Sequence, residues 1–118
     1  MWVRIDDGLL DHPKVFAAAD LLGVNGPAIV IGFFTVAVLS ASKHLSDGQL
    51  PAAVVKRFDR YVKDPLRVAE ALTKVGLFEH VNGGWQIHDF NDWQPSAATV
   101  KQRRRDDRIR KRQARGRA

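Results

Sequence analysis

The sequence contains no cysteine, which excludes a disulfide framework, a thiol nucleophile and a cysteine-based zinc site. It also lacks a continuous apolar run of the roughly 20 residues that a membrane span needs, because its longest such run is PAIVIGFFTVAVL. The opening stretch, MWVRIDDG, is acidic and has no apolar core of the kind found in secretion signals. These absences predict a cytoplasmic protein that makes no contact with a membrane.

Positive charge is scarce outside two segments. The chain of 118 residues has a net charge of +6, yet residues 1–100 hold nine Lys/Arg against eleven Asp/Glu. Residues 101–118, called the tail below, hold ten Lys/Arg and two Asp. Within the first hundred residues, 51–75 carry six basic and three acidic side chains, and 76–100 carry no Lys or Arg at all. A polyanionic partner is therefore expected to meet residues 51–75 and the tail.

The apolar content of 45% is enough for one core, so a single domain over residues 1–100 is expected, followed by the tail. WVRI reads as a short strand, and HPKVFAAADLLG reads as a helix with Pro13 in its first turn and Gly23 at its end. Helical spacing places four residues of this helix on its buried face: Val15, Ala18, Ala19 and Leu22. NGPAIVIGFFTVAVLSASKH reads as a longer helix with Asn25 as its cap. Because this helix is apolar nearly all round, it should be buried on most sides, in the core or in a dimer interface.

The second half predicts further elements. Gln49-Leu50 reads as a very short strand, and AAVVKRFDRYV as an amphipathic helix with Val54, Phe58, Tyr61 and Val62 on its buried face. The next helix, LRVAEALTKV, follows Asp64-Pro65 as its cap and first-turn proline. Asn82-Gly83-Gly84 predicts a hairpin turn.

The end of the chain reads differently. NDWQPS is expected to be irregular, and a solvated helical stretch should begin at Pro95-Ser96 and fray towards QARGRA. The three tryptophans, Trp2, Trp85 and Trp93, are expected to pack in the core and at its rim.

This order of elements predicts an α+β, mostly helical fold. From residue 27 onward it reads helix, strand, helix, turn, helix, strand, wing and strand, which is the order of a winged helix-turn-helix. The prediction adds an N-terminal strand and helix in front and a basic C-terminal tail, helical or disordered, behind. The basic segment 51–75 coincides with the two helices of the predicted helix-turn-helix.

Several stretches also resemble a known family. MWVRIDDG followed by DHPKV, then LSDGQLP, AEALTKVGLFE and GGWQIHDFNDWQPS before a basic tail resemble small winged helix-turn-helix proteins of actinobacterial phages and prophages. Those proteins are described as DNA-binding or replication-initiation-like. The resemblance spans nearly the whole chain and is most specific from Val75 to Ser96. It implies a winged helix in the cytoplasm of a bacterial host, with DNA binding as the role.

Double-stranded DNA is the expected partner, with a transcription-regulating or replication-initiating role. The second helix of a helix-turn-helix enters the major groove, and the first lies against the backbone. Basic side chains of the first helix would contact phosphates, whereas those of the second would also reach base edges. A basic arm such as the tail binds phosphates without sequence preference, and two alternatives stay open for it: a solubilising role, or RNA binding through an arginine-rich helix. The predicted DNA-binding residues are Lys56, Arg57, Arg60, Lys63, Arg67, Thr73, Lys74, Asn82, Lys101, Arg103, Arg104, Arg105, Arg108, Arg110, Lys111 and Arg112.

Other functions stay open at this point. The same fold would serve as an interaction module for a phage or host replication or transcription protein, with the tail adding only nonspecific affinity. A homodimer would cover the apolar helix and match a two-fold DNA site. An enzyme is not expected, and no cofactor or metal is. Two Asp/His clusters, Asp6-Asp7 with Asp11-His12 and His88-Asp89 with Asp92, match no metallonuclease spacing.

Overall fold

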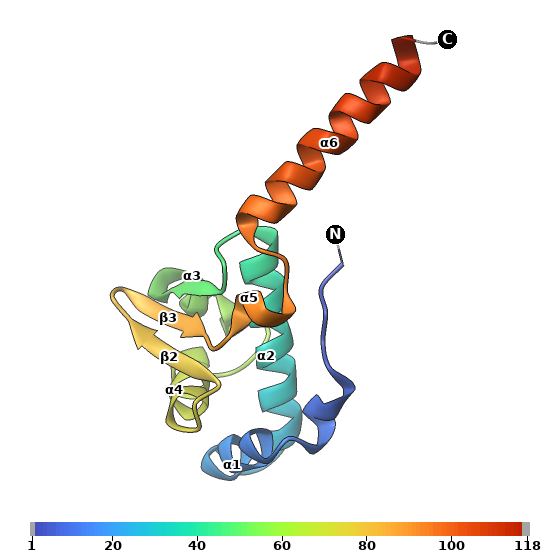
Figure 1. Ribbon diagram of the computed structural model, residues 1–118. Helices are drawn as coiled ribbons and strands as arrows, with labels where there is room; N and C mark the ends of the chain where they lie inside the picture. Colours follow the sequence, from blue (N-terminus) through green and yellow to red (C-terminus); the bar gives the residue numbers. More distant parts are fainter. Residues whose placement is uncertain (1, 117–118) are drawn as a thin grey trace.

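The computed structural model describes residues 2–116. Helices dominate, and three short strands form one small sheet (Figure 1). The elements in chain order are the 3-10 helix η1 (Asp7–Asp11), α1 (Pro13–Leu22), α2 (Gly26–Lys43), β1 (Gln49–Pro51), α3 (Ala52–Lys56), the 3-10 helix η2 (Arg57–Arg60), α4 (Pro65–Lys74), β2 (Phe78–Val81), β3 (Gly84–Ile87), α5 (Phe90–Trp93) and α6 (Ala97–Gly116). The predicted α+β, mostly helical class and the element order from residue 26 to 87 are confirmed.

The sheet is antiparallel with strand order β1-β3-β2, so the hairpin strand β3 lies in the middle. Leu50 of β1 and His80 of β2 both lie opposite Trp85 of β3. The predicted hairpin is confirmed, with Gly83 at a φ of +84° in its turn. Gly84 must lack a side chain, because a Cβ there would lie 2.2 Å from the carbonyl oxygen of Leu50 in β1.

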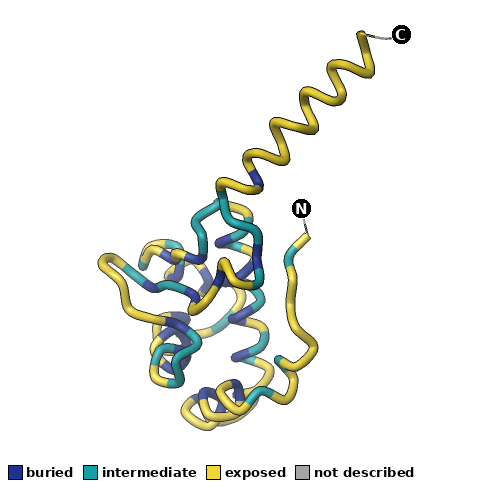
Figure 2. Tube along the Cα trace, viewed as in Figure 1, coloured by how far each residue is buried: buried dark blue, intermediate teal, exposed yellow. Residues whose placement is uncertain are grey.

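The core lies where α2 crosses the sheet and the short helices. Phe33 of α2 is fully buried, and its ring lies 5.7 Å from that of Phe58 and 5.9 Å from that of Phe78. These contacts join α2 to η2 and to the hairpin, so one aromatic cluster holds three elements together. Figure 2 shows buried segments along α1, α2, α4 and the sheet.

Helix α2 is covered around most of its circumference, with an exposed strip along one side. Val30, Phe33, Ala37 and Val38 are buried, whereas Leu39 remains 47% exposed. Most of the helix is thus buried or half-buried, as expected, and the exposed strip includes Ala28, Gly32 and Leu39. By length and composition α2 could cross a membrane (mean hydropathy 1.5), a property that it shares with core helices of soluble proteins.

Two predicted caps are wrong. Asn25 and Asp64 precede α2 and α4 in the left-handed region, at φ of 61° and 57°, and neither side chain forms a capping hydrogen bond. Tyr61 is 61% exposed rather than buried, because the predicted helix tightens into η2 after Lys56 and turns the phenol outward. Val55 takes the buried position beside Phe58.

The two ends of the body differ from the prediction. Residues 2–5 are extended but pair with no strand in the described chain, so the predicted N-terminal strand is wrong. Trp2 is 95% exposed, whereas Trp85 is buried and Trp93 half-buried. The stretch expected to be irregular contains the short helix α5, whose Phe90 ring meets that of Trp93 edge-on at 5.4 Å.

Helix α6 leaves the body as a projecting arm (Figure 1). The Ser96 hydroxyl accepts the backbone N–H of Thr99 at 3.1 Å, and Asp47 accepts that of Ala97 at 2.7 Å. Val100 is buried, and every later residue up to 116 is exposed. The tail is therefore helical as far as Gly116, without the expected fraying over 113–116, and 117–118 lie outside the described residues.

Candidate nucleic-acid interface

The basic side chains of α3, of η2 and of the turn that follows them are exposed and have no partner among the described residues. Lys56 ends α3, Arg57 and Arg60 lie on η2, and Lys63 lies in the turn before α4. Across residues 2–116, none of these four side chains forms a hydrogen bond or an ion pair with another protein group. All four predicted residues are therefore free to bind an external anion.

Helix α4 has fewer side chains available for DNA contacts than the sequence predicted. The Arg67 guanidinium donates to the carbonyl oxygen of Leu21 at 3.3 Å, where it satisfies the C-terminal end of α1. The Thr73 hydroxyl donates to the Ala69 carbonyl of its own helix at 2.8 Å. Glu70 and His80 pair at 3.1 Å. Of the three α4 residues predicted to contact DNA, only Lys74 is both exposed and unpaired among the described residues.

The hairpin places Asn82 at its exposed tip. Neither β2 nor β3 carries Lys or Arg, so a phosphate would meet only the amide and the backbone there. Asn82 lies in a tight turn that requires the positive φ of its neighbour Gly83. The hairpin turn alone therefore accounts for Asn82.

Helix α6 separates the tail residues onto two faces. In an α-helix, residues three or four apart lie on the same side. Seven cations follow one another at such steps, with no acidic residue among them: Lys101, Arg104, Arg105, Arg108, Lys111, Arg112 and Arg115. We call these residues the basic stripe. All seven are exposed.

The other face of α6 is close to neutral. Arg103, Asp106, Asp107 and Arg110 follow one another at the same three- and four-residue steps. Arg110 pairs with Asp107, and the Gln102 amide donates to Asp106 at 2.9 Å. The predicted tail residues Arg103 and Arg110 therefore lie apart from Lys101, Arg104, Arg105, Arg108, Lys111 and Arg112.

Two exposed residues beside η2 were not predicted from the sequence. Lys43 and His44, at the end of α2, line a groove together with Arg57 and Arg60, and Tyr61 stands at the same groove. Lys43 is the only Lys or Arg between residues 15 and 55, so a lone cation at the end of an apolar helix was the available signal.

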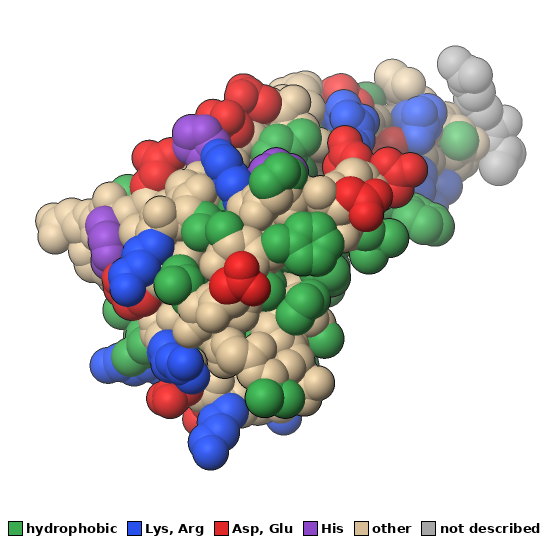
Figure 3. All heavy atoms as spheres, turned by 90° about the horizontal axis from the view of Figure 1, so that it is seen from below, with side chains coloured by type: hydrophobic (Ala, Val, Ile, Leu, Met, Phe, Trp, Pro, Cys, Tyr) green, Lys and Arg blue, Asp and Glu red, His purple; other side chains and the backbone are tan. Residues whose placement is uncertain are grey.

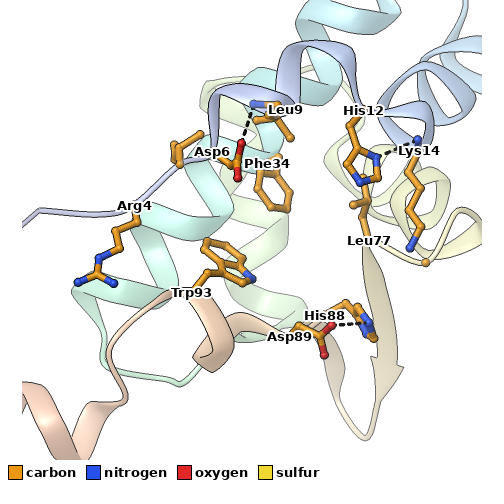
Figure 4. Close-up of a pocket in the computed structure, with 13 residues that line it drawn as sticks. Arg4, Asp6, Leu9, His12, Lys14, Phe34, Leu77, His88, Asp89 and Trp93 are labelled. Atoms are coloured by element: carbon orange, nitrogen blue, oxygen red, sulfur yellow. Dashed lines mark hydrogen bonds and ion pairs between the residues drawn. The ribbon is translucent and has the colours of Figure 1, made fainter.

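A larger groove of 850 Å³ lies between the N-terminal segment and the body (Figure 4). It brings together Asp6, His12, His88 and Asp89 from the two Asp/His clusters. Both ring nitrogens of His88 face carboxylates: Nδ1 meets Glu79, and Nε2 meets Asp89 at 2.9 Å. The hydrogen bond to Glu79, together with the charge of Asp89, raises the pKa of His88 above its ordinary 6.5.

This groove does not assemble a metal site. Both ring nitrogens of His88 contact carboxylates, so neither is free to bind a metal ion. His12 accepts the backbone N–H of Lys14 through Nδ1 at 3.1 Å, which leaves Nε2 as its one available ligand atom. Within residues 2–116, no three His, Asp or Glu side chains are placed to hold a metal ion.

The lower face of the molecule carries apolar side chains. Figure 3 looks onto the end of the body that α1 covers and shows hydrophobic side chains gathered between separate basic and acidic groups. Phe16 and Leu21 of α1 are each 47% exposed, and Val24 after the helix is 86% exposed. Leu10, in η1, adds a further side chain that is 64% exposed.

Comparisons with known proteins add no relative. No family model, no curated protein and no solved structure matches this chain.

Proposed function

We propose that this chain binds double-stranded DNA as a winged helix-turn-helix protein, with the body and α6 both contacting phosphates. The observation that carries the proposal is the basic stripe: seven cations along one side of a projecting helix, with no anion among them. At 1.5 Å per residue, a 20-residue helix is about 30 Å long, and the major groove is wide enough to admit a helix.

The body supports the same proposal through its topology. Helix α2, strand β1, the α3–η2 segment, helix α4 and the β2–β3 hairpin follow the order of a winged helix, and β1 pairs with β3. In that assignment α4 enters the major groove, and the α3–η2 segment lies against the backbone. Lys56, Arg57, Arg60 and Lys63 would then fix the position of the body on the duplex, and Lys74 would reach into the groove.

The role that follows is that of a bacterial or phage DNA-binding protein of the cytoplasm, either a transcription regulator or the DNA-anchoring part of a replication initiator. This role rests on the resemblance to the phage proteins. The Arg67 side chain is hydrogen-bonded to α1, and the Thr73 hydroxyl is hydrogen-bonded to its own helix. The contact surface is therefore rich in groups that bind phosphates and poor in groups that read bases. Affinity with little sequence preference is therefore expected.

A binding series tests the proposal. The full chain should bind a labelled duplex at low salt and release it as salt rises, because counterions compete for the phosphates. Lys74→Ala should narrow the difference between a preferred and a random duplex, by about 1–3 kcal/mol if Lys74 contacts a base. Failure of the wild-type chain to bind duplex DNA at low salt would refute the proposal.

A second function is favoured by the apolar face around α1. A winged-helix interaction module would use Phe16, Leu21 and Val24 to bind a phage or host protein, with α6 adding nonspecific affinity. Phe16→Ser would then abolish complex formation with that protein and leave duplex affinity unchanged. DNA binding as proposed above does not require the Phe16 side chain.

A further inference from the structure

A second groove, of 410 Å³, lies between the C-terminal half of α2 and the α3–η2 segment. Lys43, His44 and Ser40 enter it from α2, and Arg57, Arg60 and Tyr61 enter from the other side. Aliphatic side chains and Phe58 make up the rest of its wall. Its polar groups thus come from two elements that the aromatic core cluster holds together.

The charge of this groove is of one sign. Its lining includes three permanent cations and one histidine, and no carboxylate. Asp59, the acidic residue of η2, is not part of the lining. Within the described chain Lys43, Arg57 and Arg60 have no hydrogen-bond or ion-pair partner, so their mutual repulsion is not relieved inside the protein. An anion that enters the groove would relieve it.

The groups present suit a phosphodiester. Arginine forms paired hydrogen bonds with phosphate oxygens, and lysine adds a point charge. Tyr61, 61% exposed, offers a ring face to a sugar or base and a hydroxyl to an oxygen. Ser40 supplies a second hydroxyl at the same groove.

The groove lies at the end of the body from which α6 departs. Three residues after His44, the Asp47 carboxylate accepts the Ala97 N–H at 2.7 Å, and Figure 1 shows α6 leaving where α2 ends. One duplex is therefore within reach of the groove and of the first turns of α6.

We infer that the groove between α2 and η2 is a phosphodiester-binding subsite for the backbone of duplex DNA, with Lys43 and Tyr61 as residues of the interface. This inference rests on the proposed DNA-binding function, and it moves the contact surface of the body from α4 towards the end of α2. The helix-turn-helix assignment alone gives Lys43 and Tyr61 no role, so these two residues separate the two ideas.

The test compares Lys43→Gln with Lys14→Gln in the full chain. Lys14 is an exposed lysine of α1 that lies outside this groove, so the two variants lose the same charge. Duplex affinity is measured by fluorescence anisotropy from low to moderate salt. Lys43→Gln should flatten the log–log salt slope by about 0.9 and weaken binding about eightfold at 0.1 M salt, as expected for one lost phosphate contact. Lys14→Gln should stay within about twofold of wild type, since it loses no contact.

Amide chemical shifts give the second readout. On titration with a short duplex, the amides of residues 40–44 and 57–61 should shift together with those of α6, and the free Lys43→Gln spectrum should match wild type elsewhere. Tyr61→Phe should bind more tightly than Tyr61→Ala, which loses the ring as well as the hydroxyl.

The possible outcomes distinguish failure of this inference from failure of the proposed function. Shifts confined to α6, with Lys43→Gln binding like wild type, would overturn the inference and leave DNA binding intact. No shift and no binding of duplex by the wild-type chain at low salt would overturn both. Shifts in the groove with a weakened Lys43→Gln would support both.

Discussion

The two faces of α6 allow a matched test of how the tail binds DNA. Arg104 and Arg108 belong to the basic stripe, whereas Arg103 and Arg110 lie beside the acidic residues of the other face. The double variants Arg104→Gln/Arg108→Gln and Arg103→Gln/Arg110→Gln remove the same charge from the same helix. All four positions are exposed, so neither variant disturbs the core.

The expected difference follows from the helix geometry. Each phosphate contact contributes about 0.9 to the log–log salt slope, so loss of two contacts flattens it by about 1.8 and weakens binding roughly 60-fold at 0.1 M salt. A charge on the far side of a helix lies about 10 Å further from the phosphates, which is about one Debye length at this salt. The Arg103/Arg110 variant should therefore lose only a few-fold in affinity.

Fluorescence anisotropy with a random duplex, at several salt concentrations, measures both quantities. Circular dichroism of the free variants verifies that the helix content is unchanged. Equal losses for the two variants would refute the reasoning, because a tail that binds as an unstructured polycation has no preferred face.

Three further predictions concern the body. Removal of residues 101–118 should leave the thermal midpoint within a few degrees of wild type, because no side chain from 101 to 116 is buried; a larger drop in a thermal melt would show that the tail packs on the body. The pKa of His88, followed by imidazole NMR, should lie above 6.5 and should fall in Glu79→Gln. Because folding raises this pKa, His88 stabilises the fold fully below pH 6.5, and its stabilisation disappears as the pH rises through the raised pKa. An unchanged titration in Glu79→Gln would refute that origin of the shift. Sedimentation equilibrium at micromolar concentration should give a homodimer that Ala28→Glu dissociates, because Ala28 lies on the exposed strip of α2 and outside the groove; a monomer mass for the wild type would contradict this.

Local sequence signals predicted most of the fold. Gly23, Pro13 and Pro65 marked helix ends, and Asn82-Gly83 marked the hairpin, because these residues restrict or permit particular backbone angles. The buried residues of α1, namely Val15, Ala18, Ala19 and Leu22, were read correctly from helical spacing.

The errors arose where tertiary contacts decide the structure. Asn25 and Asp64 have capping side chains, but the left-handed backbone before each helix turns them away from the first-turn N–H groups. Trp2 and Tyr61 are large enough to pack, yet no neighbouring element covers them within the described chain. Composition alone does not reveal which elements come together.

The candidate site was predictable in charge but not in geometry. The sequence located the cations of residues 51–75 and of the tail, since charge needs no fold to be counted. It did not reveal that Arg67 bonds to Leu21, because those residues are 46 positions apart. Lys43 was missed for the same reason, since its partners in the groove lie on η2.

The salt dependence of the binding of the wild-type chain to a random duplex decides whether the protein binds duplex DNA through its phosphates. We expect a linear log–log plot whose slope reaches about −6 if all seven cations of the basic stripe contact phosphates, and stays steeper than about −3 if only four do. A slope shallower than about −2, or no binding of the duplex at low salt, would contradict it.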